Sequence, residues 1–66
     1  MEKTVKMWVC VANGIVDASS LAYTRKMSVQ REVDRARSQI QPDLEWEDVK
    51  SWGYKCVKVN VKIELA

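Results

Sequence analysis

The chain has 66 residues, of which 47% are hydrophobic and 30% charged, a balance that predicts one folded domain and excludes a disordered chain. A domain of this length buries only about 60% of the surface that its unfolded chain exposes, so we expect modest stability. No run approaches the roughly 20 apolar residues that a membrane span needs. The formal net charge of +2 is too small to impose nucleic-acid binding.

The residue types on which most enzymes and metal sites depend are scarce. The chain has no histidine, Cys10 and Cys56 lack the spacing of a zinc site, and the two glycines cannot form a phosphate-binding loop. The sequence therefore predicts a non-enzymatic protein without cofactor or metal, with both cysteines as free thiols in strands. The N-terminus lacks a signal-peptide apolar block, so we expect a cytoplasmic protein.

The first predicted element is a strand from Val5 to Val11, in which apolar side chains stand at the odd positions. We expect this apolar side to face the helices. Trp8 would then lie on the opposite side, where it covers Tyr23 or awaits a partner such as a second copy of the chain. The dipeptide Asn13-Gly14 predicts a tight hairpin turn.

The return strand has three alternatives. Ile15-Val16 could pair directly after the turn, or residues 17–20 could form a loop before a strand centred on Leu21, Tyr23 and Arg25, which we favour. A helix that begins near Asp17 is the third alternative.

A longer helix is predicted over residues 28–40, because Ser28 suits the N-cap and four apolar residues fall on one helical stripe: Val29, Val33, Ala36 and Ile40. Pro42 disfavours helical geometry at the residue before it and so ends the helix. The outer face of this helix would present Gln30, Arg31, Asp34, Arg35, Arg37 and Ser38.

Asp43 is expected to cap a second, shorter helix that runs through Trp52, and Gly53 suits the left-handed position at its end. Alternating apolar and polar residues from Val57 to Leu65 predict the last strand. The predicted fold is a small two-layer α+β domain, in which both helices cover one face of a three-stranded antiparallel sheet. The order is strand, strand, helix, helix, strand.

Two charged regions are candidate binding surfaces. The segment from Pro42 to Trp52 joins four carboxylates to two tryptophans, a combination that suits a basic protein partner, although either tryptophan could instead plug the end of the core. Basic residues in the region 25–37 favour nucleic acid as the alternative partner, although Glu32 and Asp34 predict local salt bridges with the arginines. The predicted partner-binding residues are Gln30, Arg31, Asp34, Arg35, Glu45, Trp46, Glu47, Asp48 and Trp52, and the alternative nucleic-acid surface is Arg25, Lys26, Arg31 and Arg35.

The order of elements resembles the small phage antitoxins of the Dmd type. The resemblance rests on Met1-Glu2 before an alternating strand, Tyr23-Thr24-Arg25, Val29-Gln30 at the opening of the helix, and Cys56-Val57-Lys58-Val59. It implies a protein that binds and occludes a host ribonuclease toxin in the host cytoplasm. The acidic segment departs from the family pattern, and Arg31 stands where the family has an aromatic residue, so no functional residue is transferred.

Two further resemblances are ranked lower. Arg35-Ala36-Arg37 followed by residues 44–49 is similar to dodecins, small flavin-binding oligomers, in which Trp46 would stack on the flavin. The chain lacks their long hairpin before the last strand and their glycine-containing loop after the first. The general architecture also resembles short phage inhibitors of bacterial RNA polymerase.

Overall fold

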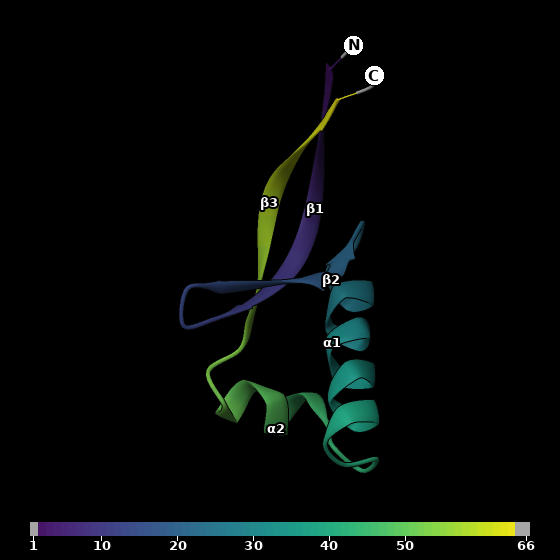
Figure 1. Ribbon diagram of the computed structural model, residues 1–66, viewed down its shortest axis with the longest axis vertical. Coiled ribbons are helices and arrows are strands. Elements are labelled where there is room, and N and C mark those ends of the chain that lie inside the picture. Colours follow the sequence, from purple (N-terminus) through teal and green to yellow (C-terminus); the bar gives the residue numbers. More distant parts are fainter. Residues whose placement is uncertain (1, 65–66) are drawn as a thin grey trace.

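The computed structural model describes residues 2–64 and shows a three-stranded antiparallel sheet with two helices (Figure 1). The elements are β1 (Glu2–Ala12), β2 (Ile15–Ala22), α1 (Arg25–Gln39), α2 (Trp46–Ser51) and β3 (Lys55–Glu64). β1 is the central strand, with β2 and β3 at the two edges. This arrangement confirms the predicted α+β class. No helix within residues 2–64 is long and apolar enough to cross a membrane.

The turn at Asn13-Gly14 joins β1 to β2. Its two residues have φ values of 52° and 78°, the positive angles that a tight hairpin turn requires and that asparagine and glycine tolerate. Ile15 therefore pairs directly with Ala12 across the turn. The predicted hairpin is confirmed, and of the three alternatives for the return strand the immediate pairing is correct.

β2 ends at Ala22, so the favoured strand centred on Leu21, Tyr23 and Arg25 is wrong. The register of β2 against β1 is irregular. Asp17 lies opposite Cys10 and Ala22 lies opposite Trp8, so five steps along β2 correspond to two steps along β1. The extra residues form a bulge, which interrupts the alternation of side chains and hides the strand in the sequence.

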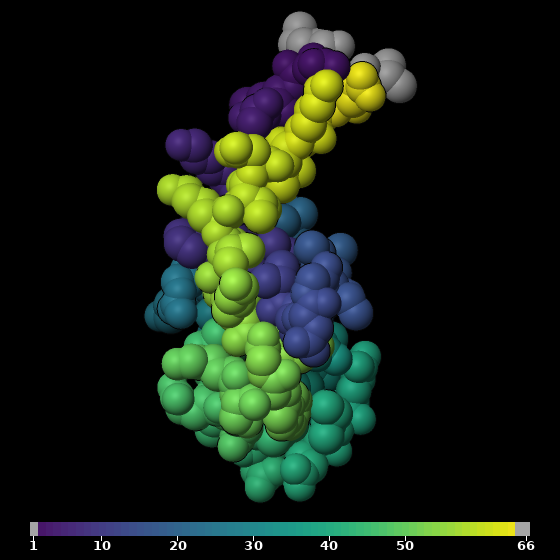
Figure 2. Space-filling view, turned by 90° about the vertical axis from the view of Figure 1, so that its left-hand side faces the viewer, coloured from purple at the N-terminus to yellow at the C-terminus, as the bar shows by residue number. Residues whose placement is uncertain are grey.

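β1 and β3 pair without interruption, from Glu2 opposite Glu64 to Val11 opposite Lys55. β2 pairs with β1 only at residues 8–12 of β1. Residues 2–7 and 59–64 therefore continue alone as a two-stranded segment, which we call the ribbon. The ribbon projects from the body of the molecule (Figures 1 and 2). The whole molecule is therefore elongated, with extents of 43 × 20 × 18 Å.

α1 begins at Arg25, three residues before the predicted N-cap. The Thr24 hydroxyl accepts a hydrogen bond from the Met27 backbone N–H at 3.2 Å and caps the helix. Ser28 is instead buried in the first turn, where its hydroxyl lies 3.7 Å from the Cys10 Sγ. The Ser28 cap is therefore wrong, whereas the predicted end of the helix before Pro42 is confirmed.

α1 covers the face of the sheet that carries Cys10, which corrects the prediction that the odd-numbered valines of β1 face the helices. Because side chains alternate along a strand and β1 keeps a regular register with β3, Lys6 and Trp8 share this face. The Lys58 Nζ lies 5.9 Å from the centre of the Trp8 ring, whereas Tyr23 is 67% exposed. Trp8 is thus covered by a lysine rather than by Tyr23.

The main hydrophobic cluster is small and lies where α1 meets α2. It consists of Val33, Ala36, Leu44 and Val49, with Val29, Trp46 and Tyr54 packed against it. Ile40, the last residue of the predicted stripe, is 57% exposed because α1 ends before it. The stripe is therefore correct for the helix interior and wrong at its end.

α2 begins at Trp46 and is capped by Glu45 rather than by Asp43. The Asp48 carboxylate accepts the Glu45 backbone N–H at 2.9 Å, which completes a capping box. Gly53 follows the helix with a φ of 99°, as expected for a glycine at this position. Leu65, the last residue of the predicted final strand, lies outside the described residues.

Candidate functional site

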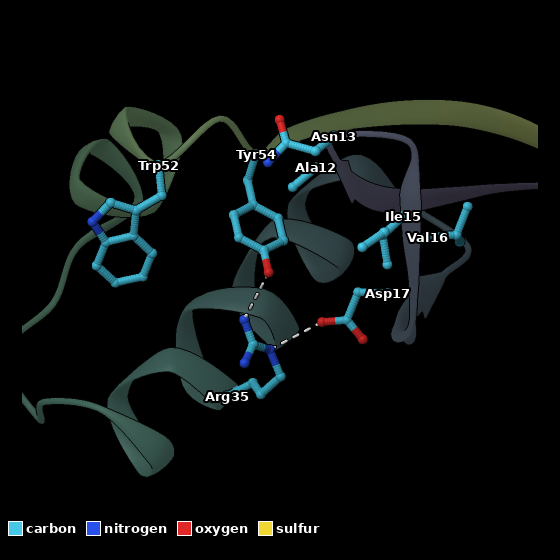
Figure 3. A pocket seen from close by; sticks show the side chains of 8 residues that line it. All are labelled: Ala12, Asn13, Ile15, Val16, Asp17, Arg35, Trp52 and Tyr54. Atoms are coloured by element: carbon cyan, nitrogen blue, oxygen red, sulfur yellow. Dashed lines mark hydrogen bonds and ion pairs between the residues drawn. The ribbon is translucent and has the colours of Figure 1, made fainter.

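A groove lies between the β1–β2 hairpin and the chain that follows α2 (Figure 3). Its volume is about 440 Å³, and its lining residues are Ala12, Asn13, Ile15, Val16, Asp17, Arg35, Trp52 and Tyr54. Three of them are large apolar side chains with high exposure: Ile15 at 72%, Val16 at 59% and Trp52 at 41%. Apolar side chains gathered around a concave surface are typical of a binding site.

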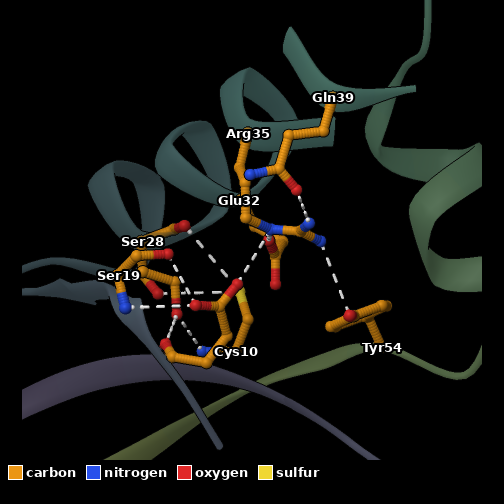
Figure 4. Close-up of polar contacts among 9 residues, drawn as sticks. Cys10, Ser19, Ser28, Glu32, Arg35, Gln39 and Tyr54 are labelled. Atoms are coloured by element: carbon orange, nitrogen blue, oxygen red, sulfur yellow. Dashed lines mark hydrogen bonds and ion pairs between the residues drawn. The ribbon is translucent and has the colours of Figure 1, made fainter. Parts of the chain in front are cut away.

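The floor of the groove is an ion-pair network centred on Arg35 (Figure 4). The Arg35 Nε lies 2.6 Å from the Glu32 Oε2 and 3.0 Å from the Asp17 Oδ2. Its Nη2 donates to the Tyr54 hydroxyl at 3.5 Å, and its Nη1 donates to the Gln39 Oε1 at 3.0 Å. One guanidinium thus connects α1 with β2 and with the segment before β3.

The two carboxylates of this network have shifted pKa values. Burial raises the pKa of Glu32, and the hydrogen bond from Arg35 offsets part of that effect. Burial alone would also raise the pKa of Asp17, but hydrogen bonds from Ser19 and the charge of Arg35 hold it below its ordinary value. Within residues 2–64, the Glu32 Oε1 has no hydrogen-bond partner. The contacts of Arg35 with Asp17, Glu32 and Tyr54 hold its guanidinium in place beneath the groove.

Cys10 lies close to this network but is buried. Desolvation raises the pKa of its thiol to about 11, so the thiol stays protonated near neutral pH and is a weak nucleophile. Cys56 lies opposite it on β3, and both thiols are free. Within residues 2–64, no three histidine, cysteine, aspartate or glutamate side chains are grouped so as to hold a metal ion.

The predicted partner-binding residues of α1 do not form one surface. Gln30 and Asp34 are exposed and hydrogen-bonded to each other at 2.8 Å. Arg31 is exposed, but its Nη1 donates to the Leu21 carbonyl. Arg35 faces the sheet, so its predicted place on the outer face is wrong. Only part of the α1 prediction therefore describes a free surface.

The acidic segment, which we define as Asp43, Glu45, Glu47 and Asp48, is exposed as a whole. Two of its members have structural roles, because Glu45 and Asp48 form the capping box of α2. Glu45 also pairs with Arg37 at 3.1 Å, and Glu47 lies 3.8 Å from the Lys50 Nζ. Asp43 forms no ion pair within residues 2–64.

The two tryptophans predicted as a pair have different environments. Trp46 is half-buried against the hydrophobic cluster, as expected for a residue that plugs the core. Trp52 follows α2 and lines the groove. Sequence reasoning missed Ile15, Val16 and Tyr54, although two apolar residues directly after a tight turn are a signal that could have found the first two.

Four further cations lie away from α2, on the sheet and in the first turn of α1, and we call them the basic group. Lys6 and Lys58 lie on the face that carries Cys10, and Arg25 and Lys26 form the first turn of α1, which points toward the ribbon (Figure 1). None of these four forms an ion pair within residues 2–64. No acidic residue in the first turn of α1 offsets the positive end of the helix dipole.

No protein-family model, curated protein or solved structure matches this chain. The fold defines a small α+β domain with an open three-stranded antiparallel sheet. Any functional assignment therefore depends on the groove, the acidic segment and the basic group.

Proposed function

We propose that this chain is a non-enzymatic inhibitor that binds a protein partner through the groove, with the acidic segment beside it. The exposure of Ile15, Val16 and Trp52 around one concave surface carries this proposal. Large apolar side chains cost free energy when they face water, and aromatic residues dominate the binding energy of many interfaces. The fixed position of Arg35 gives the groove a preformed polar floor that needs no ordering on binding.

The acidic segment favours a partner with a basic surface. Asp43 and Glu47 are exposed carboxylates without a role in the capping box of α2, so they are available to attract positive charge. Ribonucleases bind a polyanion and carry basic surfaces for it. Together with the resemblance to phage antitoxins, this supports a host ribonuclease toxin as the partner and the host cytoplasm as the place of action.

An affinity capture from a nuclease-treated bacterial lysate tests the proposal. We expect the immobilised chain to retain a basic ribonuclease, and the free chain to suppress its cleavage of RNA. The variant Ile15→Asp places a charge in the groove at a side chain that is 72% exposed, so it should fold normally and lose at least about tenfold in binding. Tyr23→Asp is the matched control, because Tyr23 is 67% exposed and lies outside the groove.

Equal capture by the Ile15→Asp variant would remove the groove as the contact surface. Capture of a protein whose ribonuclease activity the chain leaves unchanged would remove the inhibitor function. Trp46, which would stack on flavin in a dodecin, packs against the hydrophobic cluster, so we do not propose flavin binding.

Nucleic-acid binding is the second candidate, and the basic group favours it. The predicted surface changes, because Arg35 is bound within the network, whereas Lys6, Arg25, Lys26 and Lys58 form no ion pair within residues 2–64. These four can contact phosphates, which makes affinity steeply salt-dependent. The double variant Lys6→Glu/Arg25→Glu should then abolish retention on single-stranded RNA at low salt. If the native chain shows no shift with RNA or DNA at low salt, this candidate is rejected.

A further inference from the structure

β3 is an edge strand along its whole length. In the sheet order β2-β1-β3, one side of the strand has no pairing partner within residues 2–64. Figure 2 faces this strand and shows it, in yellow-green to yellow, uncovered from the body to the end of the ribbon. The strand contains no proline and keeps an unbroken register with β1, so it lacks two features by which edge strands avoid further pairing.

The side chains of β3 divide between the two faces of the sheet. Val57, Val59, Val61 and Ile63 lie on one face, and Lys58, Asn60, Lys62 and Glu64 lie on the other. The apolar face of the ribbon is not covered by a helix, and Ile63 is 38% exposed. A two-stranded ribbon is marginal in water unless a further strand or another layer supports it.

We propose that β3 pairs with β3 of a second copy of this chain. The two strands run antiparallel, with Val61 opposite its counterpart, so that the two sheets join into one. In this register Val59 lies opposite Ile63 of the second copy, and Lys58 lies opposite Glu64. Within this paired segment each apolar residue lies opposite an apolar residue. Lys58 at one end of the segment lies opposite Glu64 at the other end of the second copy, and Asn60 lies opposite Lys62.

Neighbouring registers are unfavourable because they bring like charges together. When Asn60 is the centre, Lys58 lies opposite Lys62; when Lys62 is the centre, it lies opposite itself. A shift to a centre between two residues places apolar side chains opposite polar ones. Registers centred on Val59 or Ile63 also keep the two faces separate, but the first joins no opposite charges and the second pairs only residues 62–64 of β3. The register centred on Val61 joins opposite charges over the longest paired segment.

Lys58 and Glu64, which meet in this register, have no ion-pair partner within residues 2–64 of one chain. Glu64 lies opposite Glu2 on β1, and the Lys62 Nζ pairs with Glu2 at 3.1 Å. The ammonium group of Lys58 lies over the Trp8 ring and forms no ion pair. A second copy supplies a glutamate for Lys58 and a lysine for Glu64.

The free edge of β1 is a weaker candidate for self-pairing. Only residues 2–7 lack β2 beside them, and the register that pairs Glu2 with Lys6 sets Lys3 opposite Val5. The paired segment of β3, residues 58–64, is longer and matches along its length. The β3 contact lies at the opposite end of the molecule from α2, so it leaves the acidic segment free (Figure 1).

A charge-swap experiment on the full chain tests this contact. Sedimentation velocity over a range of concentrations should show a monomer–dimer equilibrium. Lys58→Glu and Glu64→Lys each place like charges opposite each other twice per dimer, so each should raise the dissociation constant by about tenfold. The double variant Lys58→Glu/Glu64→Lys restores opposite charges and should restore the dimer.

Lys55→Glu is the matched control, because Lys55 lies in β3 outside the paired segment and should leave the dissociation constant unchanged. Circular dichroism checks that each variant is folded, and rescue by the double variant separates the contact from a folding defect. A native chain that stays monomeric at its highest soluble concentration overturns the proposal. A dimer that ignores the single substitutions, or that the double variant fails to restore, overturns it as well.

Discussion

Arg35 is the residue that joins the most parts of the fold. It binds Glu32 in its own helix, Asp17 in β2 and Tyr54 before β3. Because Glu32 is fully buried, removal of the guanidinium leaves a carboxyl group without its cation in the interior. Arg35→Met should lower the free energy of unfolding by about 3–5 kcal/mol, as measured by urea denaturation.

Lys26→Met is the control for this prediction. Lys26 is exposed and forms no ion pair within residues 2–64, so its loss should change the unfolding free energy by about 0.5 kcal/mol or less. Similar effects of the two substitutions would show that the network contributes little to stability.

The raised pKa of Glu32 makes stability depend on pH. A group whose pKa is higher in the folded chain than its ordinary value of 4.5 stabilises the fold while it is protonated and loses that contribution as the pH rises through its folded pKa. Glu32→Gln mimics the protonated form. The variant should therefore gain stability relative to the native chain as the pH rises above 4.5.

Urea denaturation of both proteins at a series of pH values, from acidic to neutral, measures this difference. A stability difference between the variant and the native chain that stays constant over the series would show that the pKa of Glu32 is the same in the folded and unfolded chains. A variant that loses stability relative to the native chain as the pH rises would show that the pKa of Glu32 is lowered by folding.

The same residues show where prediction from sequence stops. Arg31 and Arg35 stand four positions apart, which suggested a shared outer face, and Glu32 was expected only in a local salt bridge with an arginine. The salt bridge is present, but it is buried because Asp17 and Tyr54 approach from other elements. Helical periodicity describes one element at a time and does not contain such contacts.

At the scale of elements, the contact between α1 and α2 holds the main hydrophobic cluster. Leu44 belongs to this cluster and is 7% exposed, whereas Ile40 lies just after α1 and is 57% exposed. Leu44→Ala should cost about 2–5 kcal/mol of unfolding free energy, and Ile40→Ala should cost less than about 0.5 kcal/mol. Thermal or urea unfolding of the two variants measures the contrast, and a comparable loss from both would contradict this placement of the core.

The elements that could be predicted are those with local signals. The strands β1 and β3 and the turn at Asn13-Gly14 have signals that depend only on neighbouring residues, and the structure confirms all three elements. The face of β1 that meets the helices was not predictable in this way. The start of α1 could not be decided in this way, because Thr24 and Ser28 are both suitable N-caps. Packing of Ser28 against Cys10 selects Thr24 as the cap.

The groove was only partly predictable for the same reason. Trp52 was a candidate because tryptophan is frequent at interfaces. Ile15 and Val16 were not, because the bulge in β2 obscured the strand to which they belong. The groove exists only once the hairpin and the chain after α2 lie side by side (Figure 3).

At the scale of the whole molecule, the acidic segment lies at the α2 end, away from the ribbon (Figure 1). Carboxylates beside a binding site attract a basic partner and accelerate association. Asp43→Asn/Glu47→Gln should slow association with the captured partner and flatten its salt dependence, with little change in the dissociation rate.

Surface plasmon resonance at several salt concentrations measures these rates. Glu2→Gln removes a carboxylate at the ribbon end and should leave the association rate unchanged. If Asp43→Asn/Glu47→Gln binds as fast as the native chain at low salt, the acidic segment does not steer the partner.

We propose above all that a protein partner binds at the groove. Amide hydrogen exchange of the chain, alone and in complex with the ribonuclease that it captures, tests this claim directly. We expect slower exchange on binding in residues 12–17 and 52–54, two segments that contain most of the residues lining the groove, and unchanged exchange in residues 2–7 of the ribbon. Protection confined to the ribbon, with the groove segments unaffected, would contradict it.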